Sequence, residues 1–515
     1  MLNRRQFAAS AAALLAAPAL LRAQTMWRNY PFSLGIASGD PAPDGFVIWT
    51  RLAPDPLEPH GGMGMGAMPV KWEVAGDERF QSMVAQGEAQ ARPELAHSVH
   101  VEVTGLQPDR PYWYRFEAGG ERTIRGRART LPDPASAPQA LRFGVAGCQN
   151  FEDGLYTAYR HLAREDLAFV FHYGDYIYEY RGDPLRPQHW TGDVFVPVRQ
   201  HAGQLLFSID DYRRRYAQYK ADADLQRAHA AHAFFTTFDD HEVDNNWVAA
   251  IDHRDTPPEV FRLRRAAAFQ AWYEHMPVRR ASFPNAAAIQ AYRSARFGNL
   301  AELNFLDTRQ YRSDQPCDDG FKPVCADVRS AEATMLGAEQ EAWLARNLQR
   351  RDVRWNCLAQ QVMMMSVDRR RSPNEAPARI MNMDTWAAYE GPRQRLFARL
   401  RGLDNVVVLT GDEHQNWAGL LHDDRDRPIA AEFVSTSISS GGDGQNLRPG
   451  SDTILANNPQ LKFVNDQRGY LTCDVTPDAW RTNFMVVDRV STPDGALSKR
   501  ATLAVPHGQV DLLSS

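Results

Sequence analysis

Residues 29–132 alternate between apolar and polar side chains. The alternation is clearest at 99–103 and at 112–116, where every second side chain is Val, Tyr or Phe. A period of two is typical of strands with one buried face. The segment that joins the two runs, 105–111, contains the Gly and Pro residues that suit a hairpin turn. The pattern predicts an N-terminal β-sandwich domain of the fibronectin type III or immunoglobulin-like kind over 29–132.

The pattern changes after a Pro/Ala/Ser-rich linker at 130–140. Short apolar runs there alternate with stretches that have the period of a helix, which indicates an α/β domain over 140–505. The apolar runs predict strands at 141–146, 167–173, 233–238 and 406–410, and the helical stretches include 338–350 and 394–401.

Each of these four strands is followed by residues capable of chemistry. They are Cys148, Asp175, the pair Asp240–His241, and Asp412 with His414. Ligands and catalytic groups of α/β folds gather at the carboxyl ends of strands. The four strand ends are therefore predicted to form one shared site.

The segment GDYIY contains Asp175 and Tyr178, three residues apart. One helical turn would bring both side chains to the same metal ion. A carboxylate can bridge two cations, and a phenolate suits ferric iron. The simpler alternative is an aspartate that caps a helix.

Two further segments carry ligand-type residues. FDDHEVDNN offers the carboxylate of Asp240, the imidazole of His241 and the amide of Asn245, a mixture common around divalent metals; a solvated acidic loop is the alternative. In GDEHQNW, Asp412 and His414 are two residues apart and would point the same way in an extended segment; the alternative is a histidine satisfied in a polar turn.

The chain has five cysteines. An odd number in an exported protein leaves at least one thiol unpaired or bound to something else. Cys317 and Cys325 enclose a short polar loop and are predicted to form a disulfide. Cys357 and Cys473 lie in apolar runs and are predicted to be buried thiols. Cys148 is either a metal-binding thiolate or an inert core residue.

The first residues predict export. Arg4 and Arg5 precede an apolar stretch at 8–21, which is shorter than the roughly 20 residues that span a bilayer. We interpret 1–23 as a signal for the twin-arginine translocase, with an ordinary secretory signal as the alternative. The protein is thus expected to be periplasmic or secreted, with no integral membrane span. A net charge of −5 argues against a stable nucleic-acid complex.

The motifs together resemble those of calcineurin-like metallophosphoesterases, with three departures. Cys148 replaces the usual first aspartate, Asp240–His241 replaces Asn-His, and GDEH at 411–414 replaces GHxH. These departures are typical of the alkaline phosphatase D (PhoD-like) family, which the chain also resembles in FSLGIASGDPAPDGFVIWTRLAP (32–54), LDTRQYR (306–312) and LGAEQEAWL (336–344).

The resemblance implies a β-sandwich followed by a catalytic domain of two packed sheets flanked by helices. It also implies a site with Fe(3+) and Ca(2+). Asp240 or Asn245 would add a ligand, and the sequence does not decide between them. The remaining implied metal ligands are Cys148, Asp175, Tyr178, Asp412 and His414.

The expected reaction is hydrolysis of phosphomonoesters, phosphodiesters or both, with nucleotides, phospholipid headgroups and teichoic-acid-type polymers as possible substrates. Metals would neutralise the ester and activate a water. His241 is expected to act as an acid or charge stabiliser near the leaving oxygen. Arg309 would hold a phosphate oxygen or form a surface salt bridge. An exported iron oxidoreductase and a non-catalytic binding module are the competing classes; neither accounts for all four strand ends.

Overall fold

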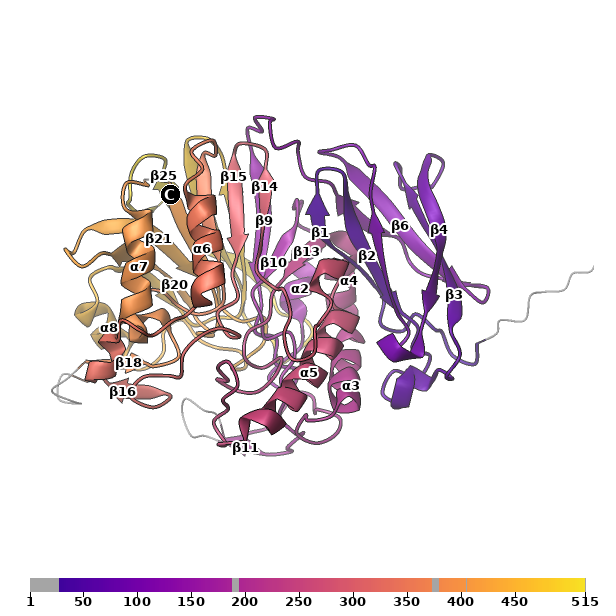
Figure 1. Ribbon diagram of the computed structural model, residues 1–515, viewed down its shortest axis with the longest axis horizontal. Helices are drawn as coiled ribbons and strands as arrows, with labels where there is room; N and C mark the ends of the chain where they lie inside the picture. Colours follow the sequence, from indigo (N-terminus) through magenta and orange to yellow (C-terminus); the bar gives the residue numbers. More distant parts are fainter. Residues whose placement is uncertain (1–26, 188–193, 373–378, 404, 515) are drawn as a thin grey trace, which may run out of the picture.

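The computed structural model describes residues 27–187, 194–372, 379–403 and 405–514 (Figure 1). The predicted export signal at 1–23 lies outside these residues. In the part of the chain described, no helix combines the length and the apolar character needed to cross a bilayer.

Two large sheets pack face to face at the centre of the molecule. The larger sheet has ten strands in the order β26-β25-β24-β23-β9-β10-β13-β1-β2-β5. The smaller has seven in the order β14-β15-β17-β19-β21-β20-β22. The ten strands are β1 (Ile36–Ala42), β2 (Gly45–Arg51), β5 (Ser98–Val103), β9 (Leu141–Ala146), β10 (Val170–His172), β13 (Ala233–Thr236), β23 (Gly469–Val475), β24 (Ala479–Val487), β25 (Leu497–Pro506) and β26 (Leu513–Ser514). The seven are β14 (Arg293–Phe297), β15 (Ala301–Phe305), β17 (Trp355–Ala359), β19 (Val406–Thr410), β20 (Asn416–His422), β21 (Pro428–Val434) and β22 (Leu461–Asn465).

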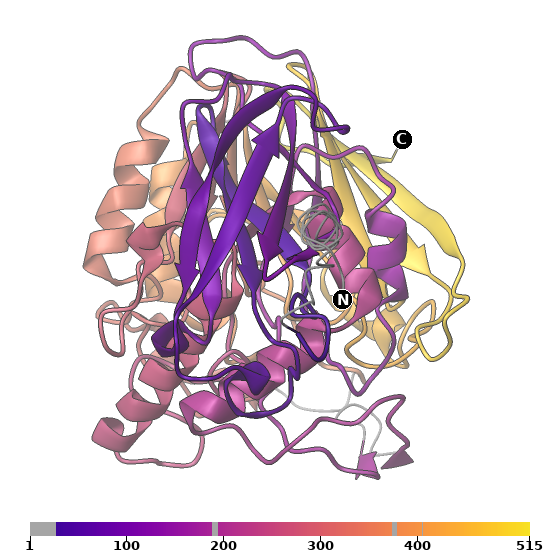
Figure 2. The same cartoon turned by 90° about the vertical axis from the view of Figure 1, so that its right-hand side faces the viewer.

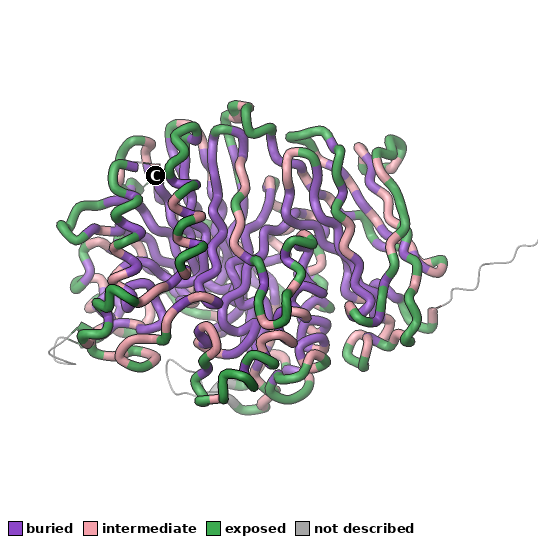
Figure 3. Tube along the Cα trace, viewed as in Figure 1, coloured by how far each residue is buried: buried purple, intermediate pink, exposed green. Residues whose placement is uncertain are grey.

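Aromatic side chains fill the space between the two sheets. Phe143 and Phe171 of the larger sheet meet Phe305 and Phe433 of the smaller one in a single buried cluster. The two sheets are the most buried part of the molecule, with exposed positions around the periphery (Figure 3). The two interleaved faces thus hold the strand ends of both sheets in fixed positions.

Helices cover the outer faces of the sandwich. Residues of α2 to α5 pack with Val170 and Phe234 of the larger sheet. Leu344 of α6 and Phe397 of α7 pack with Val408 of the smaller one. The helices are α2 (Thr157–Leu162), α3 (Ile209–Lys220), α4 (Ala223–Ala231), α5 (Pro258–His275), α6 (Gly337–Leu348), α7 (Glu390–Leu400) and α8 (Ser451–Asn457).

The N-terminal region forms a β-sandwich. One of its two layers consists of β1, β2 and β5, which are also part of the ten-stranded sheet. A third sheet, at the right of Figure 1 and facing the viewer in Figure 2, packs on β1, β2 and β5. Strand β1 pairs in parallel with β13, with Ser38 opposite Ala233 and Gly39 opposite Phe234. A side chain at Gly39 would overlap the Phe234 and Pro277 carbonyls, so only glycine permits this pairing. The third sheet contains β3 (Met68–Ala75), β4 (Met83–Ala91), β6 (Pro111–Ala118), β7 (Glu121–Arg122) and β8 (Gly126–Arg129).

The predicted fold class is confirmed: two packed sheets flanked by helices follow an N-terminal β-sandwich. The division into domains at 29–132 and 140–505 stays a prediction; strands β1, β2 and β5 of the first segment belong to the same ten-stranded sheet as strands of the second. Two small two-stranded antiparallel sheets complete the described strands: β11 (Arg186–Pro187) pairs with β12 (Val194–Phe195), and β16 (Phe321–Pro323) pairs with β18 (Ile380–Asn382).

Candidate metal centre

The candidate site lies where loops from both sheets meet. Strands β9, β10 and β13 are parallel neighbours, with Ala146 opposite His172 and His172 opposite Thr236. Their carboxyl ends are therefore aligned at one edge, and the loop after β19 joins them from the other sheet. The sulfur of Cys148 lies 3.3 Å from Oδ2 of Asp175, which shows that the first two loops meet.

Four of the predicted ligands share an unusual backbone conformation. The φ angles are +50° at Cys148, +54° at Asp175, +64° at Asp412 and +51° at His414. This left-handed region costs residues with a Cβ roughly 1–2 kcal/mol each. Such conformations persist only where the surroundings enforce them, and they cluster at functional sites.

Two motif glycines allow the loops of the two sheets to close on one another. A Cβ at Gly147 or at Gly411 would overlap the ring of Tyr173. The Tyr173 hydroxyl donates a hydrogen bond to the carbonyl of Thr436, 2.9 Å away, which fixes the ring. Cys148 and Asp412, the residues after these glycines, are brought to the same place as a result.

The donor atoms fall into three groups, each with all its atoms within 4.8 Å of one another. Asp175 belongs to two of the groups and Asp240 to two, so the groups are contiguous. The groups are Cys148 with Asp175 and His414; Asp175 with Asp240 and His241; and Asp239 with Asp240 and Asp412. Thiol, imidazole and shared carboxylates at this spacing suit two neighbouring cations.

The electrostatics of these carboxylates also fit bound cations. Burial raises the pKa of Asp175 and of Asp412 well above the ordinary value, and neighbouring carboxylates raise both further. Buried oxygens of Asp175, Asp239 and Asp240 have no hydrogen-bond partner among the described residues. Unpaired buried charge is costly unless a counter-charge is present, and a cation would supply it.

The Tyr178 side chain lies in this cluster, as the sequence predicted, but the backbone between Asp175 and Tyr178 is not helical. Its hydroxyl donates to Oδ2 of Asp175 at 2.9 Å and lies 3.1 Å from Nε2 of His414 and 2.7 Å from Oγ of Ser440. The expected helical turn is wrong: the segment from Gly174 to Tyr180 is irregular, because the left-handed Asp175 interrupts any helix at its start. The helix-capping alternative for Asp175 fails for the same reason.

Asp240 and Asn245 occupy different positions relative to the donor groups. Asp240 belongs to two of them, and its Oδ2 accepts a hydrogen bond from the backbone of Asn246 at 2.8 Å. The side-chain oxygen of Asn245 instead accepts the Tyr180 hydroxyl at 3.0 Å. This geometry favours Asp240 as the ligand, and its role stays a prediction.

His241 lies against the cluster in a fixed orientation. Its Nδ1 donates to Oε2 of Glu179 at 2.8 Å, and its ring stacks on Tyr178 with centroids 4.1 Å apart. Burial disfavours the charged ring, but the carboxylates of Asp240 and Glu179 outweigh it and raise the pKa of His241 well above its ordinary value. With Nδ1 held by Glu179, Nε2 is turned toward the donor cluster and lies 3.8 Å from Oδ2 of Asp240.

Arg309 is completely buried, so the surface salt bridge expected as an alternative is wrong. Its Nε donates to Asp239 at 2.5 Å, and its Nη2 lies 2.8 Å from Asp384 and 3.6 Å from Asp240. Arg309, together with the buried Arg312, whose guanidinium also pairs with Asp384, thus balances the charge of these buried carboxylates. The tight packing of these carboxylates around the guanidinium could not be inferred from the sequence.

Three further acidic residues shape the site and were not selected from the sequence. Glu242 accepts hydrogen bonds from the backbone N–H groups of Asp175, Tyr176 and Asp239 at 2.7 to 3.1 Å, which ties the loop after β10 to the loop after β13. Glu179 orients His241, and Asp239 joins the third donor group. The sequence signal that could have identified these three residues is their position inside the segments GDYIYEY (174–180) and DDHE (239–242).

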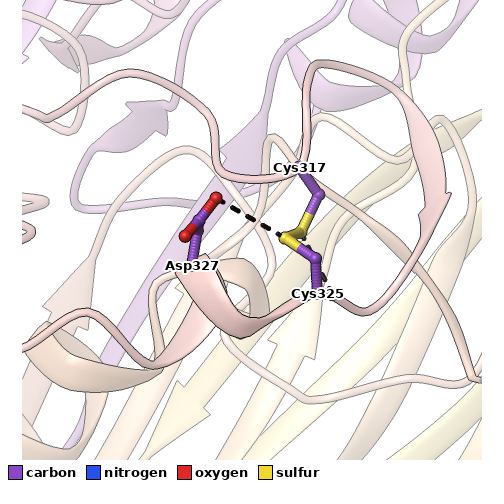
Figure 4. The surroundings of a disulfide bond; sticks show 3 residues. All are labelled: Cys317, Cys325 and Asp327. Carbon is purple, nitrogen blue, oxygen red and sulfur yellow. Dashed lines mark hydrogen bonds between the residues drawn. A yellow bond between two sulfur atoms is a disulfide. The ribbon is translucent and has the colours of Figure 1, made fainter.

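The predicted disulfide and the predicted buried thiols of Cys357 and Cys473 are confirmed, and the role of Cys148 as a metal ligand stays a prediction. Cys317 and Cys325 form a disulfide, and Cys148, Cys357 and Cys473 are free and buried. Figure 4 shows the disulfide beside Asp327, whose Oδ2 lies 3.9 Å from the sulfur of Cys325.

The sandwich of two sheets, with carboxylates, imidazoles and a thiol at its strand ends, defines the class of metal-binding phosphoesterases. The model of the "PhoD-like phosphatase" family matches residues 143–484, and that of the "PhoD-like phosphatase, N-terminal domain" matches residues 16–132. The chain belongs to the PhoD-like phosphatase family, and it is a phosphoesterase.

Individual relatives agree with this assignment. The chain is 47% identical to alkaline phosphatase D of Bacillus subtilis (strain 168) over 490 residues, which cover 94% of this chain and 82% of that protein. It is 46% identical to a solved structure of PhoD, with a TM-score of 0.90 over 95% of this chain and 92% of the other. A purple acid phosphatase from yellow lupin, at 12% identity and a TM-score of 0.54 over 92% of this chain and 74% of that one, shares the fold.

Proposed function

We propose that the protein is an exported, metal-dependent phosphoesterase that hydrolyses phosphomonoesters, phosphodiesters or both at the strand-end cluster. The observation that carries this proposal is the contiguity of the three donor groups through Asp175 and Asp240. Two cations held side by side can clamp the attacking and leaving oxygens of a phosphate ester. The name of the Bacillus relative, alkaline phosphatase D, agrees with this chemistry.

Fe(3+) and Ca(2+) are the metals that suit the donors. The Cys148 thiol, the Tyr178 hydroxyl and the His414 imidazole lie around Asp175, a set that fits ferric iron. The carboxylates of Asp239, Asp240 and Asp412 offer the oxygen ligands that calcium prefers. Asp175 would bridge the two positions.

Bound metals would neutralise the anionic ester and lower the pKa of a water molecule enough to supply the nucleophile. The protein's own contribution comes from His241, whose Nδ1 is fixed by Glu179 so that Nε2 can donate a proton to the leaving oxygen. Arg309 positions the carboxylates of the cluster, because its ion pairs with Asp239 and Asp384 hold them in place. A direct contact between Arg309 and phosphate would require one of these pairs to open.

The substrates that fit this proposal are nucleotides, phospholipid headgroups and teichoic-acid-type polymers. The proposed twin-arginine signal at 1–23 would deliver the folded protein to the periplasm or the medium. Export after folding would allow metals to be bound before export, and the Cys317–Cys325 disulfide would then form late or in the periplasm.

Chelation tests the proposal. The purified protein should lose its hydrolysis of p-nitrophenyl phosphate and of bis(p-nitrophenyl) phosphate in excess EGTA, and regain it with calcium while iron stays bound. Calcium exchanges rapidly from oxygen ligands, whereas ferric ion held by thiolate and phenolate does not. Full activity in excess chelator would contradict the two-metal site.

A further inference from the structure

The loop closed by the Cys317–Cys325 disulfide extends to the candidate metal centre. Both carboxylate oxygens of Asp319, a residue of this loop, accept hydrogen bonds from the side-chain Nδ2 of Asn246, each at 2.9 Å. The backbone N–H of Asn246 in turn donates to Oδ2 of Asp240 at 2.8 Å. Asp240 belongs to two of the three donor groups. A single residue, Asn246, therefore connects the disulfide-closed loop to a candidate metal ligand.

The backbone of Asn246 is held in one conformation. Its φ angle is +50°, in the left-handed region where asparagine is enriched among residues with a Cβ. Its carbonyl oxygen accepts a hydrogen bond from Nε2 of Gln315 at 2.7 Å. The same Nε2 donates at 2.9 Å to Asp384, the carboxylate that pairs with Arg309. The side chain and the carbonyl of Asn246 thus have separate partners, and together these partners determine the direction of its N–H toward Asp240.

The hydrogen bond from Asn246 orients the carboxylate of Asp240. Its Oδ2 accepts this bond, whereas its Oδ1 is buried and has no hydrogen-bond partner among the described residues. A carboxylate that is already held in one orientation loses less freedom when it binds a metal ion. Hydrogen-bond partners of metal ligands raise metal affinity for this reason.

The loop that carries Asp319 is short and is fixed at several points. The disulfide (Figure 4) joins residues that are 8 positions apart. Strand β16 of the loop pairs with β18, and the carbonyl of Gly320 accepts the N–H of Met383 at 2.9 Å. The N–H of Gly320 donates to Oδ1 of Asp319 at 2.6 Å. These constraints leave the Asp319 carboxylate little freedom to move away from Asn246.

We propose that Asp319 is a positioning residue of the metal centre, and that the Cys317–Cys325 disulfide sets the calcium affinity of the site through it. This inference rests on the proposed function, in which Asp240 is one of the carboxylates that bind calcium. The closed disulfide fixes the loop, Asp319 holds Asn246, and Asn246 orients the Asp240 carboxylate. The disulfide-bonded chain therefore binds calcium more tightly than a chain without the bond.

Calcium affinity, measured on the whole protein with iron bound, tests the proposal independently of turnover. Chelator-treated protein that retains iron is titrated with calcium by isothermal titration calorimetry. In Asp319→Ala the calcium dissociation constant should rise at least about fivefold, since the Asp240 carboxylate is then less well oriented. Asp319→Asn should raise it less, because its amide oxygen can still accept one hydrogen bond from Asn246.

Asp318→Asn is the matched control. It removes the same charge from the same loop as Asp319→Asn does, but the Asp318 side chain is 81% exposed and pairs with Lys322 at 3.0 Å. The calcium dissociation constant of Asp318→Asn should equal that of the wild type. Iron content and visible absorption should remain those of the wild type in all of these variants, because none of them changes the residues proposed to hold iron.

A double-variant cycle tests whether Asp319 acts through Asn246. Asn246→Ala keeps the backbone N–H but removes the amide that Asp319 holds. If the two residues act in series, Asn246→Ala/Asp319→Ala should raise the calcium dissociation constant no more than Asn246→Ala does alone. Cys317→Ser/Cys325→Ser should raise it at least about threefold, because the ends of the loop are then free to separate.

The outcomes separate this inference from the proposed function. A wild-type dissociation constant in Asp319→Ala, an equal rise in Asp319→Asn and Asp318→Asn, or independent effects of Asp319→Ala and Asn246→Ala would overturn the positioning role and leave the proposed function intact. If Asp319→Ala does not fold, the comparison of Asp319→Asn with Asp318→Asn decides. A wild-type dissociation constant in Cys317→Ser/Cys325→Ser would overturn the role of the disulfide. Failure of the wild-type protein to bind calcium would overturn the proposed two-metal site and this inference with it.

Discussion

The hydroxyl of Tyr178 lies 2.9 Å from Oδ2 of Asp175, the carboxylate that belongs to two of the three donor groups. Burial and the Asp175 charge raise the pKa of Tyr178 well above its ordinary value, so the protein alone keeps this phenol protonated. A phenolate at this position requires a strong cation close by. The protonation state of Tyr178 beside Asp175 therefore indicates whether ferric iron occupies the cluster.

Tyr178→Phe removes this oxygen and keeps the ring, so the fold should survive because the volume is almost conserved. We expect the visible absorption of an iron–phenolate bond to disappear, iron content to fall before calcium, and turnover to drop at least about tenfold. A visible spectrum beside an iron assay checks this. If the variant keeps the spectrum, the iron and the activity, Tyr178 is only a packed aromatic residue.

The Cys317–Cys325 disulfide should stabilise the protein modestly. It closes a loop with a sequence separation of 8, for which the chain-entropy model gives about 2–3 kcal/mol. The double variant Cys317→Ser/Cys325→Ser should lose about that much free energy of unfolding in a denaturant titration. Reductant should lower the stability of the wild type and leave the variant unchanged. Equal stability of both proteins, or labelling of both cysteines as free thiols in native protein, would refute the prediction.

The regular elements were predictable because their signals are local. The apolar runs at 141–146 and 406–410 coincide with β9 (Leu141–Ala146) and β19 (Val406–Thr410), and the helix expected over 338–350 is α6 (Gly337–Leu348). A strand-end residue could likewise be placed near the site because chain direction determines where a parallel strand ends.

Long-range relationships could not be predicted in the same way. The parallel pairing of β1 with β13 joins residues almost 200 positions apart, and nothing in either segment specifies the partner. The burial of Arg309 depends on Asp239 and Asp384, which come from two other loops. The left-handed turn at Asp175 depends on Glu242, which holds the backbone from a different strand end.

Lys220 should make the stability of the protein depend on pH. It is buried at the end of α3, with its ammonium 4.1 Å from the centroid of Trp49. Burial lowers the pKa of Lys220 from 10.5 to about 7. Between these pH values the unfolded chain binds a proton that the folded chain lacks, so the contribution of Lys220 to stability rises as pH increases from about 7 to 10.5.

Comparison with Lys220→Met isolates this effect. The unfolding midpoint of the wild type relative to this variant should increase steadily from pH 7 to pH 10. The same comparison with Lys462→Met, a change at an exposed lysine, should show no such trend. A wild-type-minus-Lys220→Met difference that is constant over this range, or that decreases, would contradict the burial of a lysine with a lowered pKa.

The central claim is that Asp175 joins two metal positions of one phosphoesterase site. Its most direct test is metal analysis and kcat/KM for a phosphate ester, measured on the wild type and on Asp175→Asn, with Asp166→Asn at a surface carboxylate as the control. We predict iron and calcium in the wild type and in the control, with loss of both metals and at least about a 100-fold lower kcat/KM in Asp175→Asn, since metal stabilisation of the transition state is worth several kcal/mol. Wild-type metal content and activity in Asp175→Asn would contradict the account.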